Sequence, residues 1–320
     1  MTLHAYRVDA YGLASAISDH TQIGDGRPDE GYIWLHLCAL CAETQAFLLQ
    51  QLGLDDIVVD ALMAEETRPR ALLKDDGVMV ILRGMNLNPD ADPEDMISLR
   101  LWMEGRLIVT TRRRDIRAIG DVVEQFDNGQ APQSPAEFLV SITDRLYQRM
   151  GPVLEDLEDR LSAAEEQLAL DEYDPVVSSA AAARKQTAIF TRYITPQRAL
   201  LRKLCDCQLP CLNADAKEHL VESHDLVTRY VEELHEIRDR SQILSDELSN
   251  VRERKLSEST YIFSVVATIF LPLGFITGLL GVNVGGVPGV EQSTAFWLLC
   301  GLCVGLVAIQ VVLFKWRGWF

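Results

Sequence analysis

Basic residues are scarce in this 320-residue sequence, which has 30 lysines and arginines against 47 aspartates and glutamates. The formal net charge is -17 at pH 7. A protein that binds nucleic acid needs an excess of Lys and Arg to displace counterions from the phosphates, so nucleic acid is not an expected partner. The 48% hydrophobic composition also excludes a disordered or collagen-like chain.

Catalytic motifs are missing as well. The sequence has no glycine-rich phosphate loop and no recognisable nucleophile motif. Histidines and acidic residues are present, but none of them shows a recognisable catalytic spacing. We therefore expect a protein that is not an enzyme and that uses no cofactor.

Charge almost disappears toward the C-terminal end. No Asp, Glu, Lys, Arg or His occurs in Ser259–Val290, or again in Gln292–Phe314. Each stretch exceeds the roughly 20 residues that a helix needs to cross a hydrocarbon core of ~30 Å. We expect transmembrane helices at 259–280 and 295–314, joined by a loop at 281–294. The alternative is a pair of helices buried in a soluble core.

The charges beside these spans predict their orientation. The connecting loop holds a single charge, Glu291. The positive-inside rule then places both chain termini in the cytoplasm, including the tail at 315–320. Residues 1–12 lack the basic start and apolar stretch of a signal peptide, so the acidic body is also expected there. The basic residues that flank the two spans are Arg252, Arg254, Lys255, Lys315 and Arg317.

The first part of the chain, 1–133, is expected to form an α/β domain. Short apolar runs bounded by turn residues are typical of strands, and two intervening segments have helical spacing. The sequence Asp75-Asp76-Gly77 predicts a hairpin turn. The expected strands are Leu3–Val8, Gly31–Leu37, Val78–Met85, Met96–Trp102 and Leu107–Thr111, and the expected helices are Glu43–Leu52 and Asp55–Met63.

Residues 134–258 are expected to form a helical stalk. Ser134-Pro135-Ala136-Glu137 has the composition of a helix start, and Gly151-Pro152 predicts a break. From about Asn213 the pattern is helical without proline or glycine until Pro272. Continued to Leu280, this helix would be about 100 Å long. Its apolar stripe must pack on copies of itself or on the preceding helices, so we expect an oligomer.

One face of the first predicted span is small and mildly polar. A single hairpin cannot enclose an aqueous path, but a ring of hairpins can. The alternative is ordinary helix packing through small residues. The predicted pore-lining positions, with Ser264 as an alternative to Phe263, are Thr260, Phe263, Ala267, Leu271, Gly274 and Gly278.

Seven cysteines, an odd number, imply thiols in a reducing cytosol rather than a disulfide framework. Some of them lie close enough in sequence to form part of a ligand set for a soft metal ion. The alternative is that they pack as small apolar residues and have a structural role. These partial sets are His36, Cys38 and Cys41, and Cys205, Cys207 and Cys211. Three histidines on the predicted long helix are further candidate ligands: His219, His224 and His235.

The segment Thr268–Asn283 resembles the first membrane helix of the CorA metal ion transporter family, and Gly281-Val282-Asn283 resembles that family's Gly-x-Asn signature. Further motifs resemble the zinc-transporting ZntB branch, and the resemblance covers essentially the whole chain. These motifs are Glu65–Arg70, Leu82–Pro89, Asp95–Arg100 and Thr110–Arg114.

This resemblance implies an α+β membrane protein that assembles as a funnel-shaped homopentamer in the bacterial inner membrane. It implies that Gly281, Val282 and Asn283 form the pore entrance, with Asn283 contributing one amide to a ring that contacts a hydrated divalent ion. Glu291 would attract cations or be a simple solvated charge. The implied partners are membrane lipid, further copies of the chain and divalent metal ions.

The implied function is zinc transport through a central pore, and a proton gradient is one candidate driving force. A CorA-type magnesium or cobalt channel is the alternative within this class. A membrane-anchored metal sensor or scaffold without transport is the alternative from another class. The direction of transport stays open.

Overall fold

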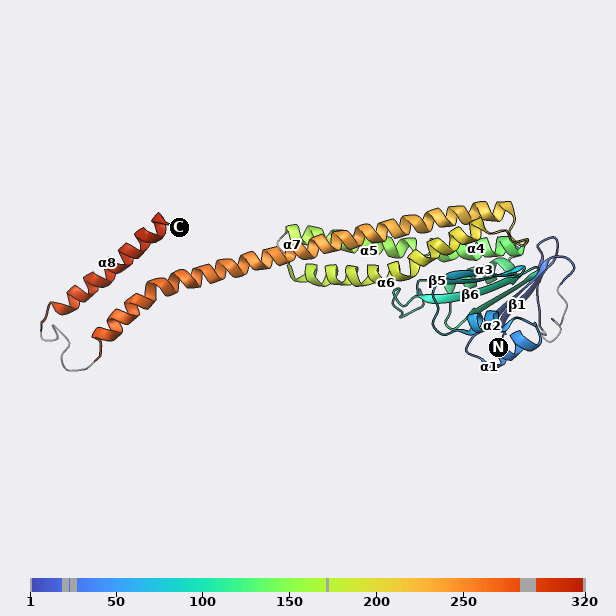
Figure 1. Cartoon of the computed structure of the whole chain (residues 1–320), viewed down its shortest axis with the longest axis horizontal. Coiled ribbons are helices and arrows are strands. Elements are labelled where there is room, and N and C mark those ends of the chain that lie inside the picture. The colour runs from blue at the N-terminus through green and yellow to red at the C-terminus, as the bar shows by residue number, and fades with distance from the viewer. Residues whose placement is uncertain (1, 19–22, 24–27, 171–172, 283–291, 319–320) are drawn as a thin grey trace. The chain divides into compact units, whose positions relative to one another are not determined.

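The computed structural model describes residues 2–18, 23, 28–170, 173–282 and 292–318 (Figure 1). The chain divides into two compact units, Met1–Ser245 and Asp246–Phe320. Each unit is described by itself below.

The first unit is built on one mixed sheet. Among the described residues, seven strands take the order β2-β1-β3-β7-β6-β5-β4. The β3–β7 pair is parallel and the other pairs are antiparallel. The strands are β1 (Thr2–Val8), β2 (Ala14–Ala16), β3 (Tyr32–Cys38), β4 (Arg70–Lys74), β5 (Gly77–Gly84), β6 (Ile97–Glu104) and β7 (Leu107–Arg112).

Helices cover both faces of this sheet (Figure 1). Side chains of α1 and α2, such as Phe47 and Leu62, pack into one core with Leu35 and Val109 of the sheet. On the opposite face, the Trp34 ring lies 4.9 Å from Phe126 of α3 and 4.9 Å from Phe138 of α4. These helices are α1 (Ala42–Gln50), α2 (Asp56–Met63), α3 (Arg117–Asp127) and α4 (Pro135–Gln148).

The helical part begins and breaks where the sequence predicts. The Ser134 hydroxyl accepts a hydrogen bond from the Glu137 backbone N–H at 3.2 Å, which caps α4. The expected break is also confirmed, because α4 ends at Gln148 and the next helix starts at Gly151. The remaining helices are α5 (Gly151–Ala169), α6 (Tyr173–Asp206), α7 (Ala214–Leu280) and α8 (Ala295–Trp316).

The first part of α7 packs on the preceding helices of its own chain. Its apolar stripe is buried at Leu220, Val227 and Leu234. The Ser223 hydroxyl donates to Asp144 of α4 at 2.6 Å. The Arg240 guanidinium donates to Glu165 of α5 at 2.7 Å. Up to Ser245, the stripe therefore has partners within the chain and does not by itself require copies of the protein.

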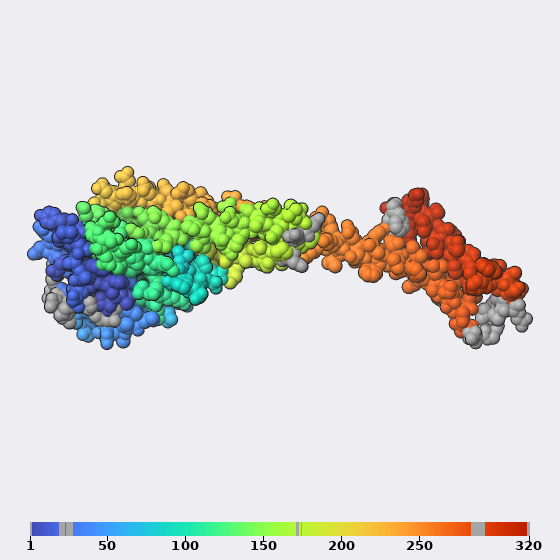
Figure 2. Space-filling view, turned by 180° about the vertical axis from the view of Figure 1, so that it is seen from behind, coloured from blue at the N-terminus to red at the C-terminus, as the bar shows by residue number. Residues whose placement is uncertain are grey.

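The second unit holds the two long apolar helices, the end of α7 and all of α8 (Figure 2). Both are long and apolar enough to cross a membrane by length and composition. In the apolar 18-residue stretch of α7 only 6% of the residues are buried, and in that of α8 0% are buried. Helices in a soluble core would be mostly buried, so this exposure argues against the soluble-core alternative.

Candidate functional site

All six predicted pore-lining positions lie on the part of α7 that belongs to the second unit, and all six residues are exposed in the single chain. Phe263 and Leu271 are the largest of them, at 74% and 75% exposed. Apart from its chain neighbours and the nearby backbone of α7, a Cβ atom added at Gly274 or Gly278 would meet no described atom of this chain within 4 Å. The face is therefore open to lipid, to other subunits or to water.

Two hydroxyl groups of this segment are bonded to their own helix. Ser264 donates to the Thr260 carbonyl at 2.8 Å, and Thr268 donates to the Ser264 carbonyl at 2.7 Å. Such bonds satisfy the hydroxyl proton locally and leave the oxygen lone pairs free to accept. The face therefore presents weak oxygen acceptors and apolar surface to its surroundings.

The predicted entrance signature is only partly described. α7 ends at Leu280, and the Gly281 N–H donates to the Thr277 carbonyl at 2.9 Å. Val282 is 52% exposed. Asn283 and Glu291 lie outside the described residues, so their roles stay predictions from the sequence.

A polar contact that the sequence did not predict joins the two apolar helices. Pro272 has no N–H, so the carbonyl four residues earlier, that of Thr268, loses its usual donor within α7. The Gln310 side-chain amide of α8 donates to this carbonyl at 3.0 Å. Within an apolar environment an unpaired carbonyl is costly. Gln310 therefore satisfies the carbonyl that Pro272 leaves without a donor.

Replacing Gln310 with leucine is expected to destabilise the protein by about 1 kcal/mol, the size of an interhelical hydrogen bond in membranes. In a Pro272→Ala background the penalty should fall toward zero, because the alanine N–H can bond to the Thr268 carbonyl. Unfolding midpoints of the two single variants and the double variant in detergent measure this coupling. An equal penalty in both backgrounds would contradict the assignment.

The candidate thiol ligands near the end of α6 are poorly suited to metal binding in this structure. Burial is the main cause that raises the pKa of Cys205, Cys207 and Cys211. The Cys207 thiol also donates to the Leu204 carbonyl at 3.1 Å. Metals bind the thiolate form, so a raised pKa disfavours binding.

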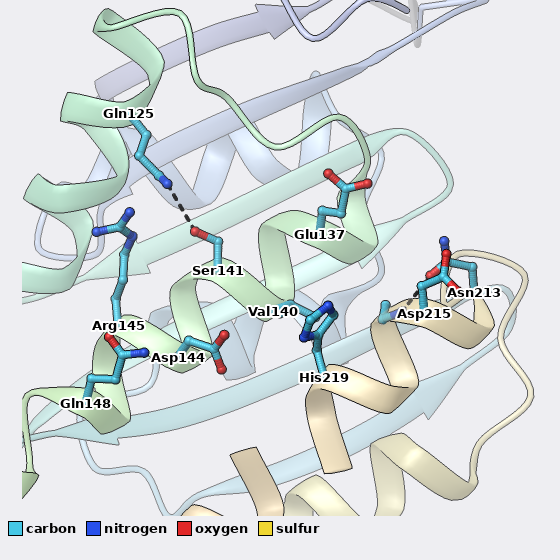
Figure 3. Close-up of a pocket in the computed structure, with 11 residues that line it drawn as sticks. Gln125, Glu137, Val140, Ser141, Asp144, Arg145, Gln148, Asn213, Asp215 and His219 are labelled. Carbon is cyan, nitrogen blue, oxygen red and sulfur yellow. Dashed lines mark hydrogen bonds between the residues drawn. The ribbon is translucent and has the colours of Figure 1, made fainter. Parts of the chain in front are cut away.

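The candidate histidines on α7 lie apart from these thiols. His224 faces Asp225 at 3.1 Å, and His219 lines a polar pocket of about 570 Å³ between α4 and α7 (Figure 3). In that pocket Asp144 has a raised pKa, mainly through burial, although its bond from Ser223 opposes the shift. Within the part of the chain that the structure describes, the side chain of the exposed His235 makes no hydrogen bond or ion pair. Within the described ranges, no three His, Cys, Asp or Glu side chains are placed to hold a metal ion.

The motifs that resemble the zinc-transporting branch meet at one end of the sheet. Arg83 donates to the carbonyls of Thr67 at 2.9 Å and Met96 at 2.6 Å. Arg100, which is buried, donates to the Ala64 carbonyl at 2.6 Å. Burial, followed by two neighbouring arginines, lowers the pKa of Arg100 to about 10. These arginines bind backbone carbonyls and so fix the loops around the sheet.

A sheet-based N-terminal unit, followed by a helix that continues into the first of two exposed apolar helices, defines a class of membrane proteins with two C-terminal spans. This chain belongs to the CorA family, described as CorA-like Mg2+ transporter protein, because the sequence model of that family matches residues 29–316.

Two named relatives match nearly the whole chain. The divalent cation transporter CmaX of Pseudomonas aeruginosa is 34% identical over 294 residues, covering 91% of this chain and 88% of that protein. The zinc transport protein ZntB of Yersinia enterocolitica is 34% identical over 305 residues, covering 95% of this chain and 92% of that protein. The predicted membership of the CorA family is therefore confirmed.

Solved structures confirm the fold of the single chain, an α/β domain followed by a long helix and a second apolar helix. The structure of full-length CmaX, at 32% identity, matches with a TM-score of 0.86 and covers 98% of this chain and 97% of that one. The CorA magnesium transporter of Methanocaldococcus jannaschii matches with a TM-score of 0.81 over 100% of both chains. Because the sequence identity to this second structure is only 20%, the similarity is evidence for a shared fold and for nothing further.

Proposed function

We propose that this chain is a divalent metal cation transporter of the bacterial inner membrane and that zinc is its principal cargo. The observation that carries the proposal is the family match over residues 29–316, which includes the two exposed apolar helices. The relative from Yersinia enterocolitica, named a zinc transport protein, supports the choice of zinc.

In this proposal five copies form a funnel with both termini of each chain in the cytoplasm. The exposed face of α7 lines a central pore, and the Asn283 amides form a ring at the periplasmic entrance. An assembly of this kind explains why Leu271 is exposed and why Gly274 and Gly278 have open space beside them in the single chain.

The chemistry of this face limits how the ion travels. Zinc prefers imidazole and thiolate ligands, yet the six predicted pore-lining positions include no His, Cys or carboxylate. Weak oxygen acceptors suit outer-shell contacts to an ion that keeps its water. We infer that the ion passes the pore hydrated, and that zinc preference is set outside this face.

The magnesium or cobalt alternative has support of its own, because the family description names Mg2+. Measuring the uptake of zinc and of magnesium into liposomes that contain the purified protein distinguishes a zinc transporter from a magnesium channel. We expect zinc to accumulate. Free passage of magnesium with exclusion of zinc would select the alternative, and no flux of either ion would favour a sensor or scaffold.

The driving force is tested in the same liposomes. Neither 259–280 nor 295–314 contains an acidic residue or a histidine that could relay protons. A membrane potential acts on the ion itself, at about 2.3 kcal/mol per elementary charge per 100 mV. Imposed voltage and pH gradients of each sign show which gradient moves the ion and in which direction.

Replacing Glu291 with glutamine is expected to lower zinc entry from the loop side by roughly twofold to tenfold at low ionic strength, because a ring of charges concentrates cations. The difference should vanish in high salt, which screens exposed charges. Glu258→Gln removes a carboxylate at the other end of the span and is the matched control. An equal effect of both substitutions, or no salt dependence, would contradict the role of Glu291.

A further inference from the structure

A Cys-x-x-Cys sequence lies at the junction between β3 and α1, in a part of the first unit that the transport proposal does not use. Cys38 is the last residue of β3, and Cys41 is the residue that precedes the first turn of α1. The Cys41 N–H donates to the Cys38 carbonyl at 3.4 Å, so residues 38–41 form a tight turn.

This turn brings the two cysteines within reach of a covalent bond. A four-residue turn keeps the Cα atoms of its first and last residues within ~7 Å of each other. A disulfide needs a Cα separation of about 4.4–6.8 Å. The range of Cα separations that such a turn allows therefore overlaps the range that a disulfide needs.

Hydrogen bonds on both sides hold the turn in place. The Ala39 N–H donates to the carbonyl of Arg112 at the end of β7, at 2.9 Å. The buried Thr44 donates twice: its hydroxyl to the Cys38 carbonyl at 2.8 Å and its N–H to the Cys41 carbonyl at 3.0 Å. The thiols are thus presented by a fixed backbone, which favours their reaction with each other over reaction with distant thiols.

The two thiols are also accessible, and the surroundings of Cys38 favour its thiolate form. Both side chains are partly exposed. Burial alone would raise the pKa of Cys38, but hydrogen bonds from the Leu40 backbone and from the Cys41 thiol and backbone outweigh it and lower the pKa. The thiolate is the form that attacks a disulfide. The thiols of Cys205, Cys207 and Cys211 have raised pKa values instead.

We propose that Cys38 and Cys41 are a redox-active dithiol that closes to an intrachain disulfide by exchange with a small-molecule disulfide. The Cys38 thiolate attacks one sulfur of the small disulfide, forms a mixed disulfide and releases one thiolate. The Cys41 thiolate then attacks the Cys38 sulfur and releases the second. Two protein thiols are oxidised, one disulfide is reduced to two thiols, and the two thiol protons pass to the released thiolates.

The test incubates the full-length protein in detergent with oxidised glutathione and maps the products by peptide mass spectrometry. We expect the peptide that contains 38–41 to lose two hydrogens before the peptide that contains Cys205, Cys207 and Cys211 reacts, and reduced glutathione to restore it. In Cys41→Ser the exchange should stop at a glutathione adduct on Cys38.

Matched controls separate this site from general thiol oxidation. Cys205→Ser should leave the loss of two hydrogens at 38–41 unchanged, whereas Cys38→Ser should abolish it. Serine is close to cysteine in size, and size-exclusion elution of each variant checks that the assembly is intact. The proposal is overturned if 38–41 stays reduced at every glutathione ratio, if the 205–211 peptide oxidises first, or if Cys41→Ser captures no adduct on Cys38.

Discussion

Replacing Asn283 with leucine is expected to lower zinc flux into liposomes at least about tenfold while leaving the assembly intact. In the proposed pore this residue supplies one amide per subunit to a ring that contacts the hydration shell of the entering ion. Each lost hydrogen bond is worth about 1 kcal/mol, and a factor of ten in rate needs only about 1.4 kcal/mol. Flux of radioactive zinc, with assembly checked by size-exclusion elution, measures the effect.

The matched control for this substitution is Gln292→Leu, which removes an amide from the same connecting segment between α7 and α8. We expect the control to transport nearly as well as the unaltered protein, because the resemblance assigns the entrance to Gly281, Val282 and Asn283 alone. Unchanged flux in Asn283→Leu would argue against a pore entrance at this position. It would also favour a sensor or scaffold that does not transport.

The second large effect is expected from Gly278→Leu. In the single chain a Cβ atom at Gly278 meets nothing within 4 Å, and leucine is a better helix former than glycine. The single chain therefore leaves open space at the position where the leucine side chain would begin. In the proposed assembly, however, five leucine side chains would enter the pore as an apolar constriction, which excludes a hydrated ion. We expect zinc flux to fall about tenfold or more.

Gly301→Leu is the matched control, because Gly301 lies on α8 and also has nothing within 4 Å of an added Cβ. The account places α8 outside the ring that lines the pore, so its flux should change little. Equal flux in the two variants would show that Gly278 does not face an ion pathway. It would support the alternative that the small residues of α7 only pack against other helices.

Much of the fold could be predicted from the sequence because its signals are local. The buried strands β3, β5 and β6 are runs of apolar residues bounded by turns, and the predicted ranges overlap those in the structure. The two apolar helices could be predicted from the absence of charged residues alone. Two elements, β2 and α3, were missed, and β4 was implied only by the predicted hairpin turn at Asp75-Asp76-Gly77, without a range of its own.

These three elements have weak local signals. β2 has only three residues, and β4 is a five-residue strand at the edge of the sheet with partly exposed side chains. The first residue before α3, Ile116, makes no side-chain capping bond, so the usual mark of a helix start is missing. Their formation depends on pairing and packing with distant segments, which local patterns do not encode.

The candidate site could be predicted only in part. The sequence pointed to the face of α7 through residue spacing, but the bond from Gln310 to the Thr268 carbonyl was not predicted from it. A signal existed, because Gln310 is a lone amide in the apolar run of α8 and Pro272 leaves one carbonyl without a donor. Matching the two requires the placement of two helices, and a one-dimensional pattern does not provide that.

The central claim is that copies of this chain surround a shared pathway for the ion. Native mass spectrometry of the purified full-length protein, released from detergent, counts those copies directly. The account predicts a single dominant species of five chains. A monomer or dimer as the dominant species would contradict it, because one or two hairpins of α7 and α8 cannot enclose a water-filled route across the membrane.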